Sequence, residues 1–413
     1  MSISGHAPAA GTAERYRAFV AEARGRSPLY EELTTGVAGD PLILGFLDAL
    51  PPAKRQPNLL FAAACYLLGV PADLRALRGL VSNRGGELAA TMLARRTQTN
   101  EPARCATLLP ALALLPQPLA LIEVGASAGL TLLPDRYSYD YGTHQVTGTD
   151  PGAPVLGCRP LGPVPIPAQV PEVAWRAGLD LNPLDVTDDD DVRWLECLIW
   201  PGETGRRERL AAAIETARRD PPRVHRGDLL TDLPALARQA PPGATLVVYH
   251  SAVLAYVVPE QRGRFAETVA ALNATWLSNE GPGILPGVTL PERDGDNFAL
   301  VQDGTAAIAI TDPHGTWIEW LALRRRGFVK SRSLVKSRSL GESRSLGKNR
   351  SRKVKNGTSA SPFRQGPHRV SRQGSAAPRC DGRNDESPTI PAIGDARPRP
   401  DSLPQGPRAC LGR

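Results

Sequence analysis

The sequence has few cysteines, and their spacing argues against two kinds of site. Six cysteines are scattered over 413 residues, and no two of them form a C-x-x-C pair. A structural zinc site or a disulfide framework needs cysteines at close, repeated spacings. We therefore predict reduced thiols, four of which lie in apolar or mixed core stretches: Cys65, Cys105, Cys158 and Cys197.

The sequence also lacks long hydrophobic runs and an N-terminal segment that resembles a secretory signal. No run of about 18 apolar residues occurs, so no membrane-spanning helix is predicted. Residues 1–17 lack the basic-then-apolar pattern of a secretory signal. We expect a cytoplasmic protein without a membrane partner. The acidic run 188–191 lacks the glycine and final glutamate of a calcium loop, so we predict a helix N-terminus there and no metal site.

Charge divides the chain sharply. Residues 324–413 hold 22 basic and 6 acidic residues, whereas residues 1–323 hold 27 basic and 36 acidic residues. The end of the chain is rich in Ser, Arg, Pro and Gly, with no Trp or Tyr. Such a segment cannot offset its ordering entropy by burial. We predict a disordered basic tail over 327–413; nucleic acid is an expected partner only for this tail.

The residues before this tail change their hydrophobic pattern once, near Pro118. Residues 12–115 show apolar residues at helical spacing, broken by Pro and Gly, which predicts a helical cap over 1–116. From Pro118 onward short apolar runs alternate with helical segments, which predicts an α/β domain with a parallel sheet over 117–326. A Gly/Pro/Tyr-rich stretch, 135–171, is expected to form a hairpin or loop insertion, and the last strands an antiparallel closing pair.

The strongest local signal is LIEVGASAGLTLL, residues 121–133. We expect a strand, a glycine turn and a helix whose first amides face a carboxylate or phosphate. A dinucleotide-binding turn would need glycines at positions 127 and 130, which hold Ser127 and Leu130.

A second interpretation is the nucleophile turn G-x-S-x-G of a serine esterase, with Ser127 as the nucleophile. Asp180 or Asp228, followed by His250 or His314, would complete the chain order of such enzymes. Against this, the strand before Ser127 is the first one predicted, and no H-G-G-G segment precedes it.

The third interpretation is a methyltransferase glycine loop. Glu123, Gly125, Ser127 and Gly129 resemble the acidic-x-G-x-G-x-G pattern of S-adenosylmethionine-dependent methyltransferases, with Ser in place of the second Gly. The resemblance implies that these four residues bind the cofactor.

Two further segments extend this resemblance. It implies that Asp180, at the end of WRAGLD, holds the ribose and that Asp228 with Leu229 flanks the adenine. Glu123 and Asp180 lie 57 positions apart, whereas about 20 is usual. We assign the excess to the 135–171 insertion; Asp140 is the rival ribose ligand if that stretch is the second strand.

Over residues 12–323 the chain also resembles a bacterial family of unassigned activity, domain of unknown function 2332. The resemblance is carried by RRTQTNEPARC, LIEVGASAGL, DRYSYDYG, GLDLNPLDV, RGDLL, HSAVLAY, LSNEGP and DPHGTW. It implies a Rossmann-like methyltransferase-type fold and supplies no substrate.

Polar side chains outside the glycine turn are candidates for the substrate side. Five lie between apolar helical runs: Arg96, Gln98, Asn100, Glu101 and Arg104. The alternative is a helix cap, with Thr99 or Asn100 as the capping residue. His250 follows an apolar strand, so we consider it, with Glu280, as a general base, or else as a hydrogen-bonded core histidine.

The sequence thus predicts an S-adenosylmethionine-dependent methyltransferase acting on a small molecule. The alternatives are a non-catalytic binding protein on the same fold and the esterase. The acceptor and the oligomeric state stay open.

Overall fold

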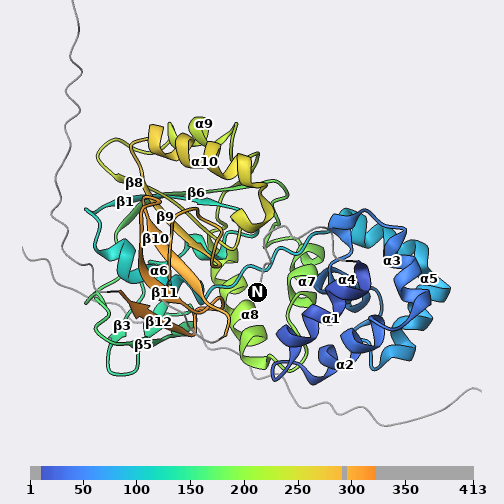
Figure 1. The fold of residues 1–413 in the computed structure, drawn as a ribbon. Coiled ribbons are helices and arrows are strands. Elements are labelled where there is room, and N and C mark those ends of the chain that lie inside the picture. Colours follow the sequence, from blue (N-terminus) through green and yellow to red (C-terminus); the bar gives the residue numbers. More distant parts are fainter. Residues whose placement is uncertain (1–10, 291–294, 322–413) are drawn as a thin grey trace, which may run out of the picture. The chain divides into compact units, whose positions relative to one another are not determined.

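In the described residues before the first strand, 11–118, the chain forms six α-helices, as the periodicity of residues 12–115 predicts (Figure 1). The computed structural model describes residues 11–290 and 295–321. These helices are α1 (Thr12–Ala23), α2 (Pro28–Val37), α3 (Pro41–Asp48), α4 (Pro57–Leu68), α5 (Leu74–Ala94) and α6 (Arg104–Ala113). Two of these helices begin with a proline that follows a side chain able to accept a hydrogen bond from the first turn. Ser27 caps α2 in this way, and Asp40 caps α3.

A nine-stranded sheet follows, in the order β5-β12-β11-β10-β9-β8-β1-β6-β7. Five neighbouring strands are parallel: β1 (Leu119–Val124), β6 (Val173–Asp180), β7 (Val224–Arg226), β8 (Thr245–Ser251) and β9 (Thr275–Glu280). Three strands then run antiparallel: β10 (Phe298–Gln302), β11 (Ala306–Thr311) and β12 (Trp317–Trp320). The α/β class is confirmed, and the antiparallel closing part has one strand more than the predicted pair.

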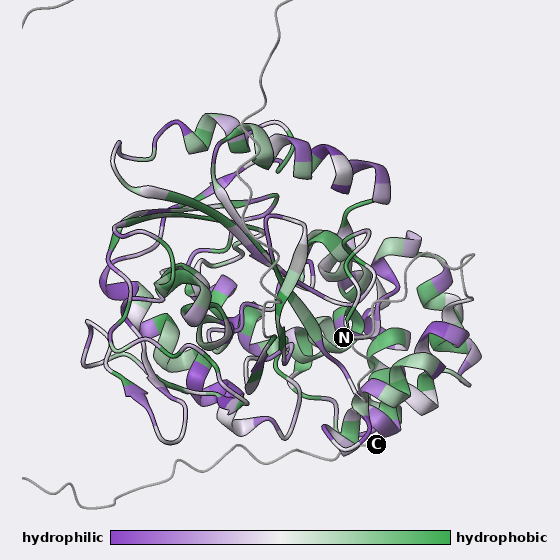
Figure 2. Cartoon of the chain, turned by 60° about the vertical axis from the view of Figure 1, so that its left-hand side comes forward, coloured by the Kyte–Doolittle hydropathy of each residue, from purple (hydrophilic) through white to green (hydrophobic). Residues whose placement is uncertain are grey.

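Helices cover both faces of the sheet, and the alternation of β1 shows how. Leu119 and Leu121 pack in the apolar cluster that contains the N-terminal helices and α8 (Thr204–Arg219). Ile122 and Val124 pack in a second cluster with α9 (Leu233–Ala237) and α10 (Pro259–Ala271). In Figure 2 the central strands are largely hydrophobic, whereas the covering helices alternate in hydropathy. This is the pattern of strands buried on both faces.

The segment 135–171 forms the expected insertion. It contains a three-stranded sheet in the order β3-β2-β4, formed by β2 (Ser138–Asp140), β3 (Gln145–Val146) and β4 (Val155–Gly157). A fourth strand, β5 (Arg159–Leu161), pairs with β12 at the edge of the main sheet. Asp140 therefore lies outside the parallel sheet, whereas Asp180 ends β6 beside β1. The rival assignment of Asp140 to the second parallel strand is wrong.

The helix expected directly after the glycine turn is absent, which corrects the sequence prediction. Only a 3-10 turn, Leu130–Leu132, follows Gly129. Pro134 comes two residues later and disfavours helical backbone at Leu133 before it. The turn therefore has no helix N-terminus.

The acidic run 188–191 begins helix α7 (Asp189–Cys197), as predicted. Asp188 caps this helix by accepting hydrogen bonds from the amides of Asp190 and Asp191. No cluster of metal-binding side chains occurs within 11–290 and 295–321. In the same ranges no helix has the length and apolarity needed to cross a bilayer. The predicted tail, 327–413, lies outside the described residues, and the cap boundary at residue 116 stays a prediction.

Candidate functional site

A pocket of about 350 Å³ lies at the carboxyl ends of the parallel strands. The strands β1, β6 and β8 end at its wall, and the turn after β7 completes that side. In sequence order these five parallel strands are arranged 3-2-1-4-5, so the order reverses between β1 and β8. Ligands of open α/β sheets bind at such a reversal. The position and volume of the pocket are those of a small-molecule site.

Nine of the predicted site residues line this pocket. From the cofactor side these are Glu123, Gly125, Ser127, Asp180 and Leu229. From the substrate side these are Arg96, Gln98, Asn100 and Arg104. Five other predicted residues are not in its lining: Glu101, Gly129, Asp228, His250 and Glu280. Segments far apart in the sequence therefore meet at one site.

Gly125 is the position where the turn after β1 needs a glycine. Its φ is +70°, a backbone conformation that residues with a side chain rarely adopt. A Cβ built there would lie 2.4 Å from Cγ2 of Val253, in the turn after β8. Glycine thus lets the β1 and β8 turns approach each other at the pocket wall.

Two amides of the glycine turn are bonded by side chains of the protein. The amide of Ser127 donates to Asp180 Oδ2 at 2.8 Å, and that of Leu130 donates to Asn100 Oδ1 at 2.7 Å. Asn100 also donates to the carbonyl of Ala126 at 3.2 Å. Asn100 is therefore no helix cap; α6 begins at Arg104, after the cap position Ala103. The amides of Ser127 and Leu130 are therefore not free to face a ligand anion.

Asp180 links the turn to the polar segment before α6. Its Oδ1 accepts hydrogen bonds from Asn182 N at 2.7 Å and from Gln98 Nε2 at 3.2 Å. Together with Ser127 N, three donors occupy a carboxylate that has about four acceptor sites. One site is free, and the longest bond, from Gln98, is the easiest to replace.

Glu123 is a buried carboxyl group on the pocket wall. The hydroxyl of Thr131 donates to its Oε1, and its Oε2 has no hydrogen-bond partner among the described residues. Burial, with a smaller contribution from the charge of Asp180, raises the pKa of Glu123 to about 8. The bond from Thr131 and the charge of Arg104 only partly oppose this rise. At neutral pH the group is therefore mostly protonated and can donate a hydrogen bond.

His250 and Glu280 lie together, but behind the pocket wall. Nδ1 of His250 lies 2.7 Å from Glu280 Oε1, and its Nε2 lies 3.0 Å from Trp276 Nε1. Since the indole can only donate, Nε2 is the acceptor and the proton sits on Nδ1. Both ring nitrogens are thus used, and the side chain is fully buried. These contacts fit the hydrogen-bonded core histidine, not the general base.

Glu280 instead holds the turn after β8. Its Oε1 also accepts hydrogen bonds from the amides of Val253 and Leu254, at 2.8 and 3.0 Å. Asp228 has a similar local role, because its Oδ1 accepts from Leu230 N at 2.7 Å. Gly129 packs close to Pro222, where an added Cβ would lie 2.7 Å from Cγ. All three shape loops beside the pocket.

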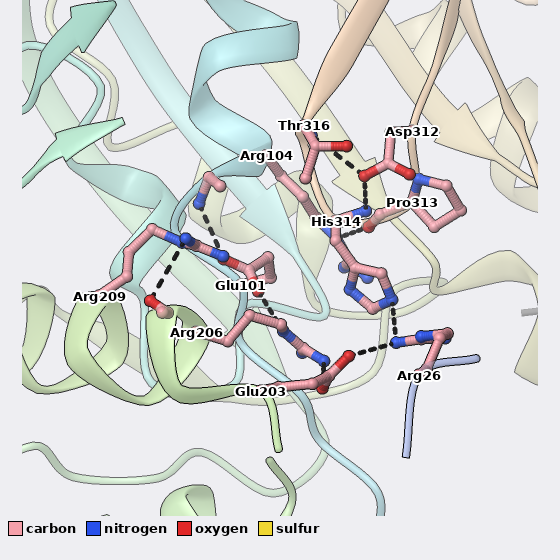
Figure 3. Close-up of polar contacts among 12 residues, drawn as sticks. Arg26, Glu101, Arg104, Glu203, Arg206, Arg209, Asp312, Pro313, His314 and Thr316 are labelled. Atoms are coloured by element: carbon pink, nitrogen blue, oxygen red, sulfur yellow. Dashed lines mark hydrogen bonds and ion pairs between the residues drawn. The ribbon is translucent and has the colours of Figure 1, made fainter. Parts of the chain in front are cut away.

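Glu101 belongs to a charged network outside the pocket (Figure 3). Arg206 and Arg209 donate to its two oxygens at 2.8 and 2.9 Å. Burial raises the pKa of the Glu101 carboxyl, but the two guanidinium charges outweigh burial and hold the pKa below its usual value. Glu203 continues the network by pairing with Arg206 and with Arg26. This network ties the segment before α6 to α8.

The contacts of Ser127 do not support the esterase. Its hydroxyl donates to the carbonyl of Gln98 at 3.0 Å. His250 bonds Glu280 and Trp276, and His314 contacts Arg26. Within the described ranges no histidine is bonded to Ser127, so the base of a catalytic triad is missing there.

Sequence reasoning missed several lining residues. Lys54 comes from a 3-10 turn between α3 and α4, and Tyr256 from the 3-10 turn after β8. Lys54 lies in the short polar break PPAKRQP, and Tyr256 ends the HSAVLAY segment that carries the family resemblance. These positions were the available signals.

Comparison with known proteins identifies a family. No curated protein matches the chain, and no solved structure matches it. The profile of one family, described as an uncharacterized protein conserved in bacteria (DUF2332), matches residues 13–320. That match covers the helical segment, the sheet and every residue of the pocket. The chain belongs to this bacterial family, DUF2332.

Proposed function

We propose that the pocket binds S-adenosylmethionine and that the protein transfers its methyl group to a small molecule. The observation that carries the proposal is the position of Asp180, a carboxylate at the end of β6 beside the reversal of strand order. A carboxylate there is suited to accept hydrogen bonds from ribose hydroxyls. The Rossmann-like methyltransferase fold is part of this proposal.

The residues present fit the nucleoside half of the cofactor. Asp180 would accept one ribose hydroxyl at its free site and a second in place of Gln98. Leu229 and Leu181 would contact the base from the turns after β7 and β6. Gly125 lets the turn after β8, with Val253, pack against the same wall of the pocket.

The amino-acid end of the cofactor needs other partners than the turn amides. The amides of Ser127 and Leu130 already donate hydrogen bonds to the side chains of Asp180 and Asn100. Glu123 offers an unpartnered oxygen on the same wall. We assign this end of the cofactor to the region of Glu123.

The bound cofactor supplies a sulfonium-activated methyl group, so the chain mainly has to position the acceptor. The polar segment before α6 would form that side of the pocket through Arg96, Gln98 and Arg104. Glu123, with its pKa near 8, can take or give a proton at neutral pH if the acceptor carries one.

The test is calorimetric titration of S-adenosylmethionine and S-adenosylhomocysteine into the full chain and two variants. Asp180→Ala should weaken binding at least about tenfold, because it removes a charged hydrogen-bond acceptor. Asp140→Ala is the control, since this carboxylate bonds only its own turn at Gly142 outside the pocket.

Equal affinity of the Asp180→Ala variant and the wild type would refute the ribose assignment. No binding of either ligand to the wild type would refute the methyltransferase proposal. Saturable binding without methyl transfer to any acceptor in a broad screen would favour the non-catalytic alternative.

A further inference from the structure

Arg104 is a buried cation that has no carboxylate partner. Its side chain is 7% exposed, and it donates from Nε to Pro313 O at 2.9 Å and from Nη1 to Ser251 O at 3.1 Å. Within 11–290 and 295–321 it forms no ion pair, and its Nη2 has no acceptor. Two other poorly exposed arginines differ: Arg176 pairs with Asp135, and Arg206 with Glu101. A buried charge is normally paired, so Arg104 lacks the anion that its burial calls for.

The nearby carboxyl groups Glu101, Glu280 and Glu123 act on Arg104 only through space. Glu101 is bonded by Arg206 and Arg209, and Glu280 by His250 and two backbone amides. Glu123 is mostly protonated at neutral pH. The pKa of His314 is held well below its usual value, first by burial and then by the charges of Arg206, Arg26 and Arg104. This histidine beside Arg26 is therefore neutral and adds no positive charge to the region (Figure 3).

The pocket itself has an excess of cationic side chains. Lys54 and Arg96 line it together with Arg104. Lys54 donates to the carbonyl of Arg95 at 2.8 Å, and burial and the charge of Arg96 lower its pKa. Two carboxyl groups line the pocket with these three cationic side chains. Glu123 is protonated, and the oxygens of Asp180 already accept three hydrogen bonds.

We propose that Arg104 binds an oxyanion of the pocket's ligand, a carboxylate or a phosphate. A guanidinium presents its N–H groups in a fixed fork, and Nη2 is the part of that fork left without an acceptor. The bonds to Pro313 and Ser251 hold the fork in place before the ligand arrives. The inference deepens the proposed function, but it rests on the pocket and does not require that a nucleoside binds there.

The oxyanion has two possible sources. One is the carboxylate at the amino-acid end of S-adenosylmethionine, for which the glycine-turn amides are not free. The other is an acidic group of the methyl acceptor, because Ser251 ends β8 on the far side of the strand-order reversal from Asp180.

The test compares Arg104→Gln with Arg262→Gln in the full chain. Arg262 is a matched control, since it also donates to two backbone carbonyls, those of Val257 and Ile284, and does not line the pocket. Thermal midpoints are measured with rising inorganic phosphate or acetate, against chloride at constant ionic strength. We expect a saturable rise in the wild type and in Arg262→Gln that is lost in Arg104→Gln.

Calorimetry with two nucleosides distinguishes the sources. S-adenosylhomocysteine carries the carboxylate, and 5′-methylthioadenosine does not. If Arg104→Gln weakens only the former, by about ten- to hundredfold, the oxyanion belongs to the cofactor. If the anion response is lost while both nucleosides bind as before, it belongs to the acceptor.

The inference is overturned if Arg104→Gln responds to phosphate and acetate as the wild type does and binds S-adenosylhomocysteine equally well. The anion titration contains no nucleoside, so it tests anion binding by Arg104 even if the methyltransferase proposal fails. Should Arg104→Gln not fold, Arg104→Lys keeps the charge and a donor; its loss of the fork should still weaken the anion response.

Discussion

The charge state of Glu123 affects both the pocket and the stability of the fold. Burial raises its pKa to about 8 from an ordinary value of 4.5. The folded protein therefore keeps a proton that the unfolded chain releases between these two values. Stability from this group is present at low pH and is lost as the pH rises through the interval, by up to about 5 kcal/mol.

Glu123→Gln should remove this pH dependence. The amide keeps the shape and the acceptor for Thr131 but cannot ionise. We expect the variant to gain stability relative to the wild type as the pH rises from about 5 to 8, because only the wild type must then keep a proton that its unfolded chain releases. Denaturant unfolding of both proteins at several pH values checks this. Parallel profiles from pH 5 to 9 would contradict it.

At the scale of elements, the approach of the β1 and β8 turns depends on Gly125. Gly125→Ala would place a Cβ 2.4 Å from Val253, in a backbone with φ of +70°. Gly69→Ala is the matched control, because φ there is +84° and nothing lies within 4 Å of the added Cβ. Its ψ of 179° lies outside the left-handed helical region, so the control should cost about 1–3 kcal/mol of backbone strain. Gly125→Ala should cost about 1–3 kcal/mol more, through overpacking.

A double variant separates the two contributions. Gly125→Ala combined with Val253→Ala should recover most of the steric cost and leave the backbone strain. Thermal and denaturant unfolding give the free energies. If the two single glycine variants lose equal stability, the turns do not press together at this point.

At the scale of the whole molecule, Glu101 joins segments distant in the chain. It is bonded by Arg206 and Arg209 of α8 while lying just before α6. Glu101→Gln would leave two poorly exposed guanidinium groups with less compensation, which typically costs about 3–5 kcal/mol. Glu87→Gln is the control: that carboxylate pairs with Arg84 at the surface, so we expect little change.

Unfolding free energies of these two variants check the role of the network. Similar losses for both would mean that the Glu101 pairs contribute no more than a surface ion pair.

Several features were predictable because they depend on local chemistry. Helical spacing and proline starts predicted the helices before β1, and short apolar runs predicted the parallel strands. The acidic run 188–191 has the composition of a helix N-terminus and forms one. Strand ends also indicated the pocket, since the carboxyl ends of parallel strands share one edge of the sheet.

Other features were not predictable, because they depend on which distant groups meet. The glycine turn resembles one that precedes a helix, yet Asp180 and Asn100 occupy its amides and only a 3-10 turn follows. His250 lies near the carboxyl end of β8, as a catalytic residue could, yet Glu280 and Trp276 use both of its nitrogens.

The sequence by itself determined the α/β class, the glycine turn and the polar segment of residues 96–104, because periodicity, backbone preference and composition act over a few residues. The tertiary structure alone decided which of these polar groups remain available to a ligand. Glu101 and Arg104 lie three residues apart, but one is bonded by two arginines and the other has no counter-ion among the described residues. The physical reason is that pairing and burial are set by groups from distant elements: arginine side chains of α8, and backbone carbonyls of β8 and of the turn between β11 and β12.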